Sequence, residues 1–269
     1  MSEVRYFVHQ PSSALRRHVR EILWVHSQRS RVQVLLPETT LTLVLRQSGS
    51  ASMRNEALPN AIISGLQQRT RFVEHEANSA LLIVRFTEVG APAILHDRVD
   101  LLYNRTAPLD SVLPWRDIDH LQNVLTDARD LQQHFMAVER FLIRRIRTQH
   151  GTILQGISPQ IEAAAQMIRR SQGRSSIAAI ARHAAMSQSA LERHFRVAVG
   201  VTPKKLSRLA RLQHVCRLWN TGKSLTAISF EAGYCDQSHM VRDFRLFTGT
   251  SPEEFFRDTR ANNLPIFSN

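Results

Sequence analysis

The sequence predicts a mixed α and β domain followed by an all-helical domain that contains a duplicated helix-turn-helix unit. Three observations support this fold class: strand-like runs in the first half, helical periodicity with an internal repeat in the second half, and a glycine-containing segment between them. The chain has 269 residues, of which 43% are hydrophobic. Because domains average roughly 100–200 residues, this length predicts two domains, which we place at residues 1–150 and 158–260.

Strand-like segments dominate the first hundred residues. Val32–Leu36 and Thr40–Leu45 are rich in Val, Leu and Thr and are separated by Pro37, and Ala80–Phe86 is a third apolar run. These runs predict strands, but the sequence does not assign their pairing.

Apolar residues then recur at steps of three and four from about residue 115 to residue 147, which predicts one or two amphipathic helices. The stripe runs from Leu121 to Ile146. It can pack on its own domain or pair two protomers, and the sequence leaves both alternatives open. Thr148–Ser158 contains Gly151 and Gly156 without any periodicity and is therefore predicted to be a linker.

The charge is distributed unevenly between the two halves. Residues 1–156 carry 19 Arg and 15 acidic residues, whereas residues 157–269 carry 16 Lys and Arg against 8 acidic residues. A basic second half is typical of a polyanion-binding surface, and nucleic acid is the commonest polyanion, although a solvated basic face gives the same count.

An internal repeat is the strongest signal in the second half. Ser187–Pro203 reads SQSALERHFRVAVGVTP, and Asp236–Pro252 reads DQSHMVRDFRLFTGTSP, with seven of seventeen positions identical. Each copy is predicted to be a helix, a tight turn and a second helix, with the turns at Ala185 and Gly233. Upstream of the first copy, a helix is predicted to begin near Ser158.

The second helix of each copy has an apolar and a polar face when it is projected at 3.6 residues per turn. The apolar positions, which are expected to be buried, are Leu191, Phe195 and Ala198 in the first copy and Met240, Phe244 and Phe247 in the second. The polar face suits a major groove, because Arg can bond to guanine, Gln to adenine, Glu to cytosine and Ser to a base or a phosphate. One such helix alone is more often an ordinary solvated face, but two with the same arrangement favour base reading. The candidate base-reading residues are Gln188, Ser189, Glu192 and Arg193 in the first copy and Gln237, Ser238, His239 and Arg242 in the second.

A single helix from Pro203 to Asn220 is predicted to join the two copies. Its expected buried stripe is Leu206, Leu209, Ala210, Leu212 or Gln213, Val215 and Leu218. At 1.5 Å per residue it spans roughly 26 Å, enough to place two compact motifs about one turn of B-DNA apart, ~34 Å. Basic residues on or beside these helices are expected to contact phosphates, which supply affinity without sequence information. They are Arg196, Lys204, Lys205, Arg208, Lys223 and Arg245.

The segment Ala227–Pro252, which reads AISFEAGYCDQSHMVRDFRLFTGTSP, resembles the C-terminal signature of the AraC/XylS family of bacterial transcription regulators. The resemblance extends over about Ser158–Arg257 and implies seven helices, two helix-turn-helix motifs joined by a long helix, and binding to double-stranded promoter DNA. By position it assigns base reading to Ser189, Glu192, Arg193, Ser238 and Arg242.

The chain departs from the family pattern at a few positions. Ala185 stands where the turn glycine is usual, and Ser229 and Val215 stand where alanine is usual. Glu192 places a negative charge near phosphates, which makes the first motif either more selective or weaker.

The first half is similar to the variable sensor and dimerisation domains of that family, which often form a small β-barrel followed by helices. The similarity implies an α+β N-terminal domain with a barrel-like sheet, and it leaves open a small-molecule effector, whose binding residues it does not assign, and a homodimer. We expect a cytoplasmic regulator associated with the bacterial nucleoid, which reads two adjacent major grooves and engages RNA polymerase if it is an activator. The alternative is an effector-independent DNA-binding protein whose N-terminal domain only dimerises.

Several other classes of protein are disfavoured. Cys216 and Cys235 are too few for a disulfide framework or a four-thiolate zinc site, and the strongest apolar run, Ala80–Val84, is too short to cross a membrane. His75, His96, His120 and His134 stand singly, so a metal-dependent barrel enzyme fused to a DNA-binding domain is an unfavoured alternative. We expect no enzymatic activity, no cofactor, no metal and no membrane partner.

Overall fold

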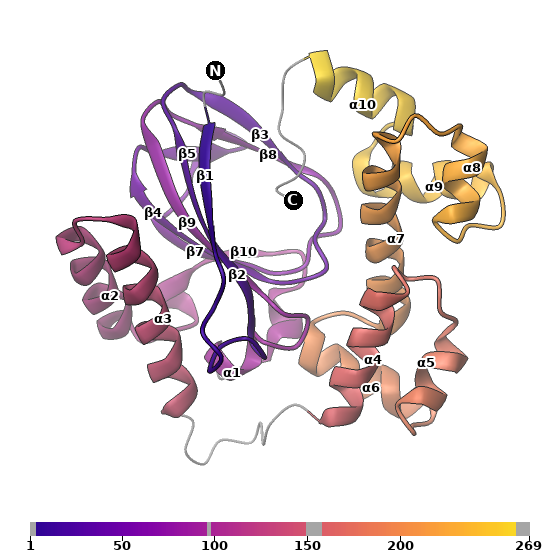
Figure 1. The fold of residues 1–269 in the computed structure, drawn as a ribbon, viewed down its shortest axis with the longest axis horizontal. Coiled ribbons are helices and arrows are strands. Elements are labelled where there is room, and N and C mark those ends of the chain that lie inside the picture. Colours follow the sequence, from indigo (N-terminus) through magenta and orange to yellow (C-terminus); the bar gives the residue numbers. More distant parts are fainter. Residues whose placement is uncertain (1–3, 96–97, 149–157, 262–269) are drawn as a thin grey trace.

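The computed structural model describes residues 4–95, 98–148 and 158–261, which form two parts (Figure 1). The N-terminal part contains two β-sheets with helices beside them, and the C-terminal part is entirely helical over the described residues. This confirms the predicted fold class. Apart from its two end residues, the predicted linker at 148–158 lies outside the described residues.

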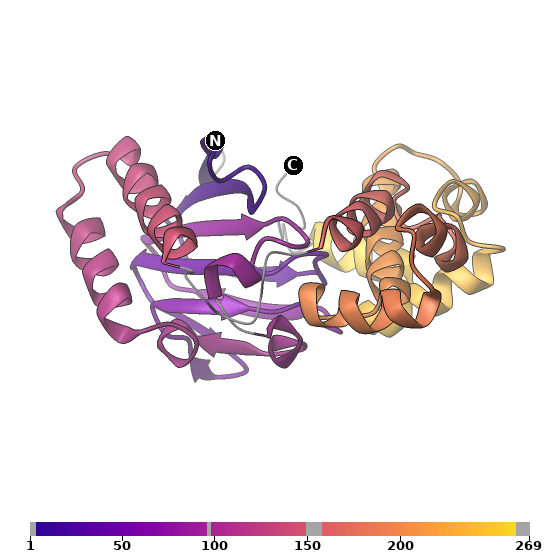
Figure 2. The ribbon, with the colours of Figure 1, turned by 90° about the horizontal axis from the view of Figure 1, so that it is seen from below.

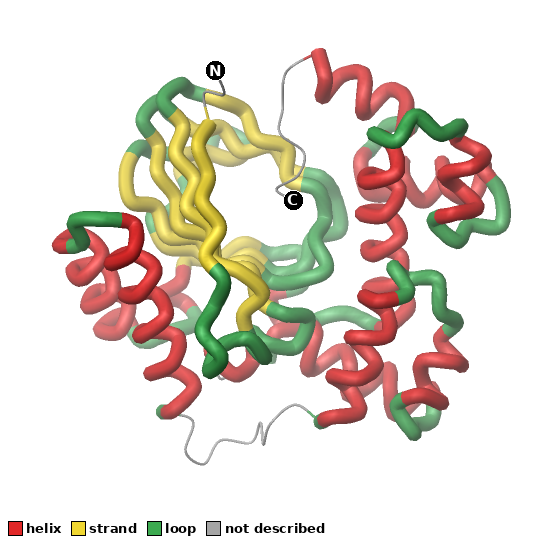
Figure 3. Tube along the Cα trace, viewed as in Figure 1, coloured by secondary structure: helices red, strands yellow, loops and turns green. Residues whose placement is uncertain are grey.

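Two antiparallel sheets make up most of the N-terminal part. In order across the larger sheet, the strands are β1 (Val4–His9), β2 (Val19–Ser27), β9 (Ser79–Phe86), β4 (Thr42–Ser48), β7 (Ala61–Ser64) and β10 (Thr106–Pro108). Across the smaller sheet they are β3 (Arg31–Leu35), β8 (Arg71–His75), β5 (Ala51–Met53) and β6 (Glu56–Ala57). The chain passes between the sheets after β2, β3, β4, β6, β7 and β8, and the sheets curl toward each other in a barrel-like arrangement (Figure 3).

The three strand-like runs of the sequence correspond to β3, β4 and β9, which confirms that prediction, although β4 begins at Thr42 rather than at Thr40. Strand β9 lies between β2 and β4, so its residues have a neighbour on each side. Val84, for example, pairs with Ile22 of β2 and with Leu43 of β4.

The outer face of the larger sheet, which points away from the smaller sheet, is the main core of this part. Leu43, Leu45, Leu82, Val84 and Phe86 are at most 1% exposed on this face. They join one core with apolar residues of the helices. Those helices and turns are α1 (Pro92–Leu95), η1 (Val99–Leu102), η2 (Leu109–Ser111), α2 (Trp115–Asp127) and α3 (Leu131–Arg147).

The predicted apolar stripe of α2 and α3 packs on its own chain. Phe135 of α3 stacks on His9 of β1 with ring centroids 4.8 Å apart, and His9 Nε2 lies 3.0 Å from Glu139 Oε1. Leu121 and Leu142 are buried as well. Of the two alternatives for this stripe, docking on its own domain is therefore the one observed for these residues.

The inner face of the larger sheet points toward the smaller sheet and carries polar and charged side chains as well as apolar ones. Arg71 of β8 fixes this orientation, because its guanidinium donates hydrogen bonds across the gap to Ser64 of β7 and Thr106 of β10. Val44 and Ile83 lie on this same face by register, and they remain partly exposed. Leu23 and Leu81, also on this face by register, are buried, so the inner face combines apolar packing with polar contacts.

The C-terminal part contains seven helices within the described residues, the number that the family resemblance implies. They are α4 (Pro159–Arg170), α5 (Ile177–His183), α6 (Gln188–Val199), α7 (Pro203–Trp219), α8 (Leu225–Glu231), α9 (Gln237–Thr248) and α10 (Pro252–Ala261). Side-chain oxygens cap most of their N-termini, where they accept hydrogen bonds from otherwise unpaired backbone N–H groups. The capping residues are Ser158, Ser176, Ser187, Thr202, Ser224 and Asp236. None of the helices in the described part of the chain is long and apolar enough to span a bilayer.

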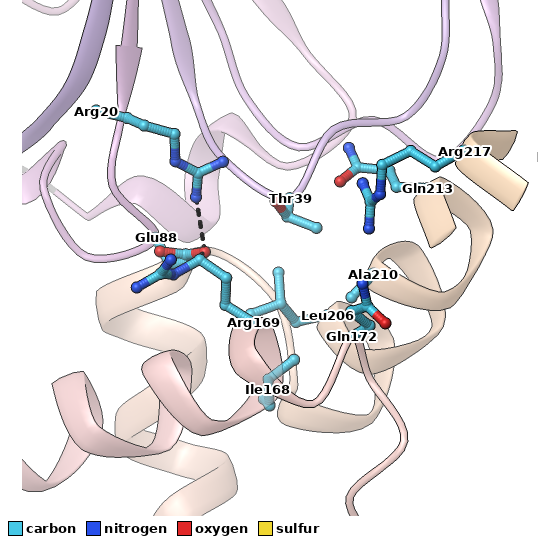
Figure 4. Close-up of a pocket in the computed structure, with 10 residues that line it drawn as sticks. All are labelled: Arg20, Thr39, Glu88, Ile168, Arg169, Gln172, Leu206, Ala210, Gln213 and Arg217. Atoms are coloured by element: carbon cyan, nitrogen blue, oxygen red, sulfur yellow. Dashed lines mark hydrogen bonds and ion pairs between the residues drawn. The ribbon is translucent and has the colours of Figure 1, made fainter. Parts of the chain in front are cut away.

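The two parts are in direct contact, and the C-terminal helices lie on the opposite side of the sheets from α2 and α3 (Figures 1 and 2). A small cavity of about 100 Å³ lies at this junction, and residues of both parts line it (Figure 4). Glu88 of the N-terminal part accepts a hydrogen bond from Arg20 at 2.8 Å and lies 3.7 Å from Arg169 of α4. Gln213 of α7 donates to Glu38 at 3.0 Å.

His75 on the inner face gives a testable pH dependence. Burial, together with the positive charges of Arg31 and Arg46, lowers the pKa of His75 to about 4. In the unfolded chain this residue binds its proton near pH 6.5, so between pH 6.5 and 4 the unfolded state holds more protons than the folded state. The free energy of unfolding should therefore fall as the pH is lowered through this range, by up to about 3 kcal/mol from this residue.

Urea unfolding at pH 7 and pH 5 measures this contribution. We expect His75→Gln to lose less stability than the wild type between the two pH values, because glutamine does not titrate. An equal loss in both proteins would contradict the assignment.

Candidate nucleic-acid interface

Helices α5 and α6 form one helix-turn-helix unit, and α8 and α9 form the second, as the repeat predicts. The two turns have the same hydrogen bonds. Met186 N donates to Ala181 O in the first unit, and Tyr234 N donates to Ser229 O in the second. Each turn also contains one left-handed residue, Ala185 with φ +50° and Gly233 with φ +80°. The chain therefore closes both turns in the same way, although only the second has the residue best suited to it.

The identical residues of the repeat perform the same local task in both units. Gly200 and Gly249, with φ +91° and +88°, end α6 and α9 in the left-handed conformation. Pro203 and Pro252 then begin the next helices, where their fixed φ is suitable. These identical residues therefore mark the same helix ends in both units.

The predicted apolar faces of α6 and α9 are buried. Phe195 and Phe244 are at most 1% exposed, as are Leu191, Met240 and Phe247. Ala198 is a partial exception, because it is half-buried and the neighbouring Val199 completes the core in its place. The exposed side of each helix is therefore the polar one.

The candidate base-reading residues lie on this exposed side. Those that are exposed are Gln188, Ser189, Glu192, Arg193, Gln237, Ser238 and Arg242. His239 is half-buried because its ring packs edge-on against Tyr234, with centroids 5.2 Å apart. Glu192 lies 3.6 Å from Arg196, one turn along the same helix, so its charge is partly balanced within α6.

The candidate phosphate-contacting residues fall into two groups. Arg196, Lys204, Lys223 and Arg245 are exposed, and Lys223 pairs with Glu231 at 2.5 Å. Lys205 and Arg208 are instead half-buried and occupied by contacts within the chain.

Lys205 is held by the N-terminal part. Its ammonium group lies 4.1 Å from the ring centroid of Tyr103 and donates a hydrogen bond to the Tyr103 hydroxyl. Burial, together with the nearby charge of Arg208, lowers the pKa of Lys205. A phosphate contact by Lys205 requires its release from Tyr103.

Arg208 links α7 to α9. Its guanidinium donates two hydrogen bonds to Asp243, at 2.6 and 3.2 Å, and Asp243 is buried. It also lies 5.4 Å from the ring of Phe247. Sequence reasoning missed this pair. The signal available was that Asp243 replaces His194 of the first copy, one of the few charge differences between the two helices.

The remaining departures from the family pattern are accommodated by packing. Ser229 is fully buried, and its hydroxyl donates to the backbone oxygen of Thr226 at 2.8 Å. Val215 is fully buried in α7. Neither residue disturbs the helix that contains it.

Comparison with known proteins identifies the helical part. A family model described as a helix-turn-helix domain matches residues 180–258, which span both repeat copies. The C-terminal part of the chain therefore contains a helix-turn-helix domain. This finding supports a DNA-binding transcription regulator. No curated protein matches the chain.

Solved structures resemble the chain at low sequence identity. ToxT from Vibrio cholerae is 12% identical with a TM-score of 0.46, and the match covers 95% of this chain and 98% of that one. The DNA-binding domain of AdpA, solved in complex with a target DNA, is 24% identical with a TM-score of 0.36 and covers 39% of this chain and 95% of that one. The xylose-binding transcription activator XylR is 22% identical with a TM-score of 0.33, covering 48% and 38% respectively.

Among the described residues, no group of three His, Cys, Asp or Glu side chains is arranged to hold a metal ion. Cys216 is buried in α7, and burial raises the pKa of its thiol.

The turn of the first unit provides a stability test. Ala185 is exposed at φ +50°, a conformation that costs an alanine roughly 1–2 kcal/mol and a glycine almost nothing. Part of this gain is offset because glycine has more freedom in the unfolded chain. We expect Ala185→Gly to raise the free energy of unfolding by up to about 1 kcal/mol.

Gly233→Ala in the second unit is the matched control. It should lower the free energy of unfolding by about 1–2 kcal/mol because the same strain is introduced rather than removed. Its added Cβ would also lie 2.6 Å from Arg174 Cγ. Urea unfolding of the full chain with either substitution measures the two changes, and a destabilised Ala185→Gly would disprove the account of this turn.

Proposed function

We propose that α6 and α9 enter two adjacent major grooves on one face of a promoter. The observation that carries this proposal is that α6 and α9 each have an exposed polar face. The two helix-turn-helix units that contain them are joined by a single helix, α7. With 17 residues α7 is roughly 26 Å long, enough to place two compact motifs about one turn of B-DNA, ~34 Å, apart.

Base recognition follows from the side chains on each helix. Arg193 and Arg242 present guanidinium groups that can bond bidentately to guanine, and Gln188 and Gln237 present amides that suit adenine. Glu192 can accept a hydrogen bond from cytosine. Ser189, Ser238 and His239 complete the proposed reading set.

Phosphate contacts provide the affinity. Arg196, Lys204, Lys223 and Arg245 are exposed and are proposed for this role, in which Arg196 and Lys223 would share their charge with Glu192 and Glu231. Lys205 and Arg208 can join them only if their contacts with Tyr103 and Asp243 are exchanged for phosphates.

The N-terminal domain, residues 1–150, is proposed to sense a small molecule and so to control DNA binding. Its contact with the DNA-binding domain at the junction of Figure 4 supports this role, because a change in one part can reach the other. The proposal extends to RNA polymerase as a partner if the protein activates transcription, and to a homodimer. The alternative is a domain that only dimerises. Melting the protein with a panel of metabolites separates them, since a ligand that binds only the folded state raises the melting temperature.

Arg242 and Lys204 provide the test of groove reading. We expect Arg242→Ala to weaken binding to a selected site by about 1–3 kcal/mol and to reduce discrimination against sites altered at one base pair. Lys204→Ala, the matched control, should weaken binding to all sequences alike and reduce the salt dependence by about one phosphate contact. Titration of selected and altered genomic fragments at several salt concentrations measures both. Unchanged discrimination in Arg242→Ala would remove the role assigned to this residue.

A further inference from the structure

The inner face of the barrel carries a group of basic side chains with few acidic partners. Arg31 of β3 pairs in register with His75 of β8, so the two side chains lie on one face of the smaller sheet. Arg46 of β4 belongs to the opposite sheet, and its charge, with that of Arg31, acts on His75. Strand β5 follows β4 directly, and its first residue, Ala51, pairs in register with His75. Arg46 therefore lies near His75 and Arg31, where the chain passes from one sheet to the other.

Arg46 and His75 are buried and Arg31 is half-buried, and all three are incompletely hydrogen-bonded. Arg46 is 8% exposed and His75 is 5% exposed. Arg46 Nε and Nη1, Arg31 Nε and His75 Nδ1 are buried nitrogens without a hydrogen-bond partner. The ring of His75 is fixed from its other side, because Nε2 lies 3.0 Å from Gln33 Oε1.

The positive charge here is not balanced as it is elsewhere in the barrel. Arg85, on the same inner face, lies 3.0 Å from Glu21 and 3.5 Å from Glu38. Neither Arg31 nor Arg46 forms an ion pair with any of the described residues. A buried guanidinium group without an acceptor is costly, because its N–H groups lose water and gain nothing in return.

An oxyanion removes this cost. A carboxylate or phosphate group accepts two parallel hydrogen bonds from a guanidinium group and supplies the missing negative charge. The adjacent inner face is apolar at Val44 and Ile83, and both remain partly exposed, whereas their outer-face neighbours Leu43 and Val84 are fully buried. The same face can therefore receive the carbon part of an organic acid.

We propose that Arg31 and Arg46, beside His75, bind the carboxylate or phosphate group of a small organic anion between the two sheets, and that this anion is the effector. The anion site gives a chemical class to the small molecule that the N-terminal domain is proposed to sense. The effector role rests on the proposed control of DNA binding by that domain.

Thermal melting of the full chain at constant ionic strength tests the anion site. The probes are hexanoate, inorganic phosphate and hexanamide, which has nearly the shape of hexanoate without the charge. We expect a saturable rise in melting temperature with hexanoate, with phosphate or with both, and none with hexanamide. A rise with hexanoate alone assigns a carboxylate ligand, and a rise with phosphate alone assigns a phosphorylated one.

Arg46→Met and Arg31→Met should each abolish the rise, whereas Arg140→Met, at an exposed position of α3, should retain it. Without any anion, Arg46→Met should melt no lower than the wild type, because it removes an unpaired buried charge. No saturable rise with either anion, an equal rise with hexanamide, or a rise retained in both inner-face variants would overturn the proposal. If one of the two inner-face variants fails to fold, the other variant still tests the anion site.

The effector role is measured separately by DNA titration with and without the stabilising anion. A changed DNA affinity that is lost in Arg46→Met supports the effector role. Unchanged affinity together with an intact rise in melting temperature overturns the effector role alone and leaves the anion site standing.

Discussion

Burial of α7 is the constraint on which the DNA-binding domain depends. Helices of both helix-turn-helix units, α6 in one and α8 and α9 in the other, pack against this helix, and so does α4. Its predicted stripe is buried, and Ser207, His214 and Cys216 on its other sides are buried as well. Because α7 is enclosed in this way, it holds the two units as one body. The distance between the two polar faces is therefore set by packing rather than by a flexible linker.

The N-terminal domain contacts both units and can therefore influence this arrangement. Val99 of η1 lies against Gly200 at the end of α6, and Tyr103 holds Lys205 at the start of α7. In the second unit, Thr70 N donates to Phe247 O of α9 at 2.8 Å. A movement of the barrel relative to α7 would change the contacts of both units together. The barrel is suited to this task because its outer face packs on α2 and α3, while its inner face carries charged side chains beside apolar ones.

The sequence was most informative where short-range chemistry determines structure. The repeat predicts both helix-turn-helix units because caps, turn residues and N-terminal prolines act over a few residues, and Ala185 adopts the left-handed conformation that its place in the repeat requires. Charge and periodicity likewise predict which face of α6 and α9 is exposed.

The sequence could not reveal contacts that depend on distant pairing. Arg31 meets His75 only because β3 pairs with β8, and Lys205 meets Tyr103 only because the two domains dock. Single basic residues in a list of charges give no sign of such partners. For this reason the sequence predicts Lys205 and Arg208 as phosphate contacts. It likewise gives no reason to single out Arg31 or Arg46.

Hydroxyl-radical footprinting of the full chain on a selected genomic site tests the central claim most directly. If α7 holds α6 and α9 for adjacent grooves, the footprint will contain two protected tracts on one face of the DNA, with centres about 10 base pairs apart. A single tract of one half-site, or two tracts whose separation varies from site to site, would contradict the rigid two-helix arrangement.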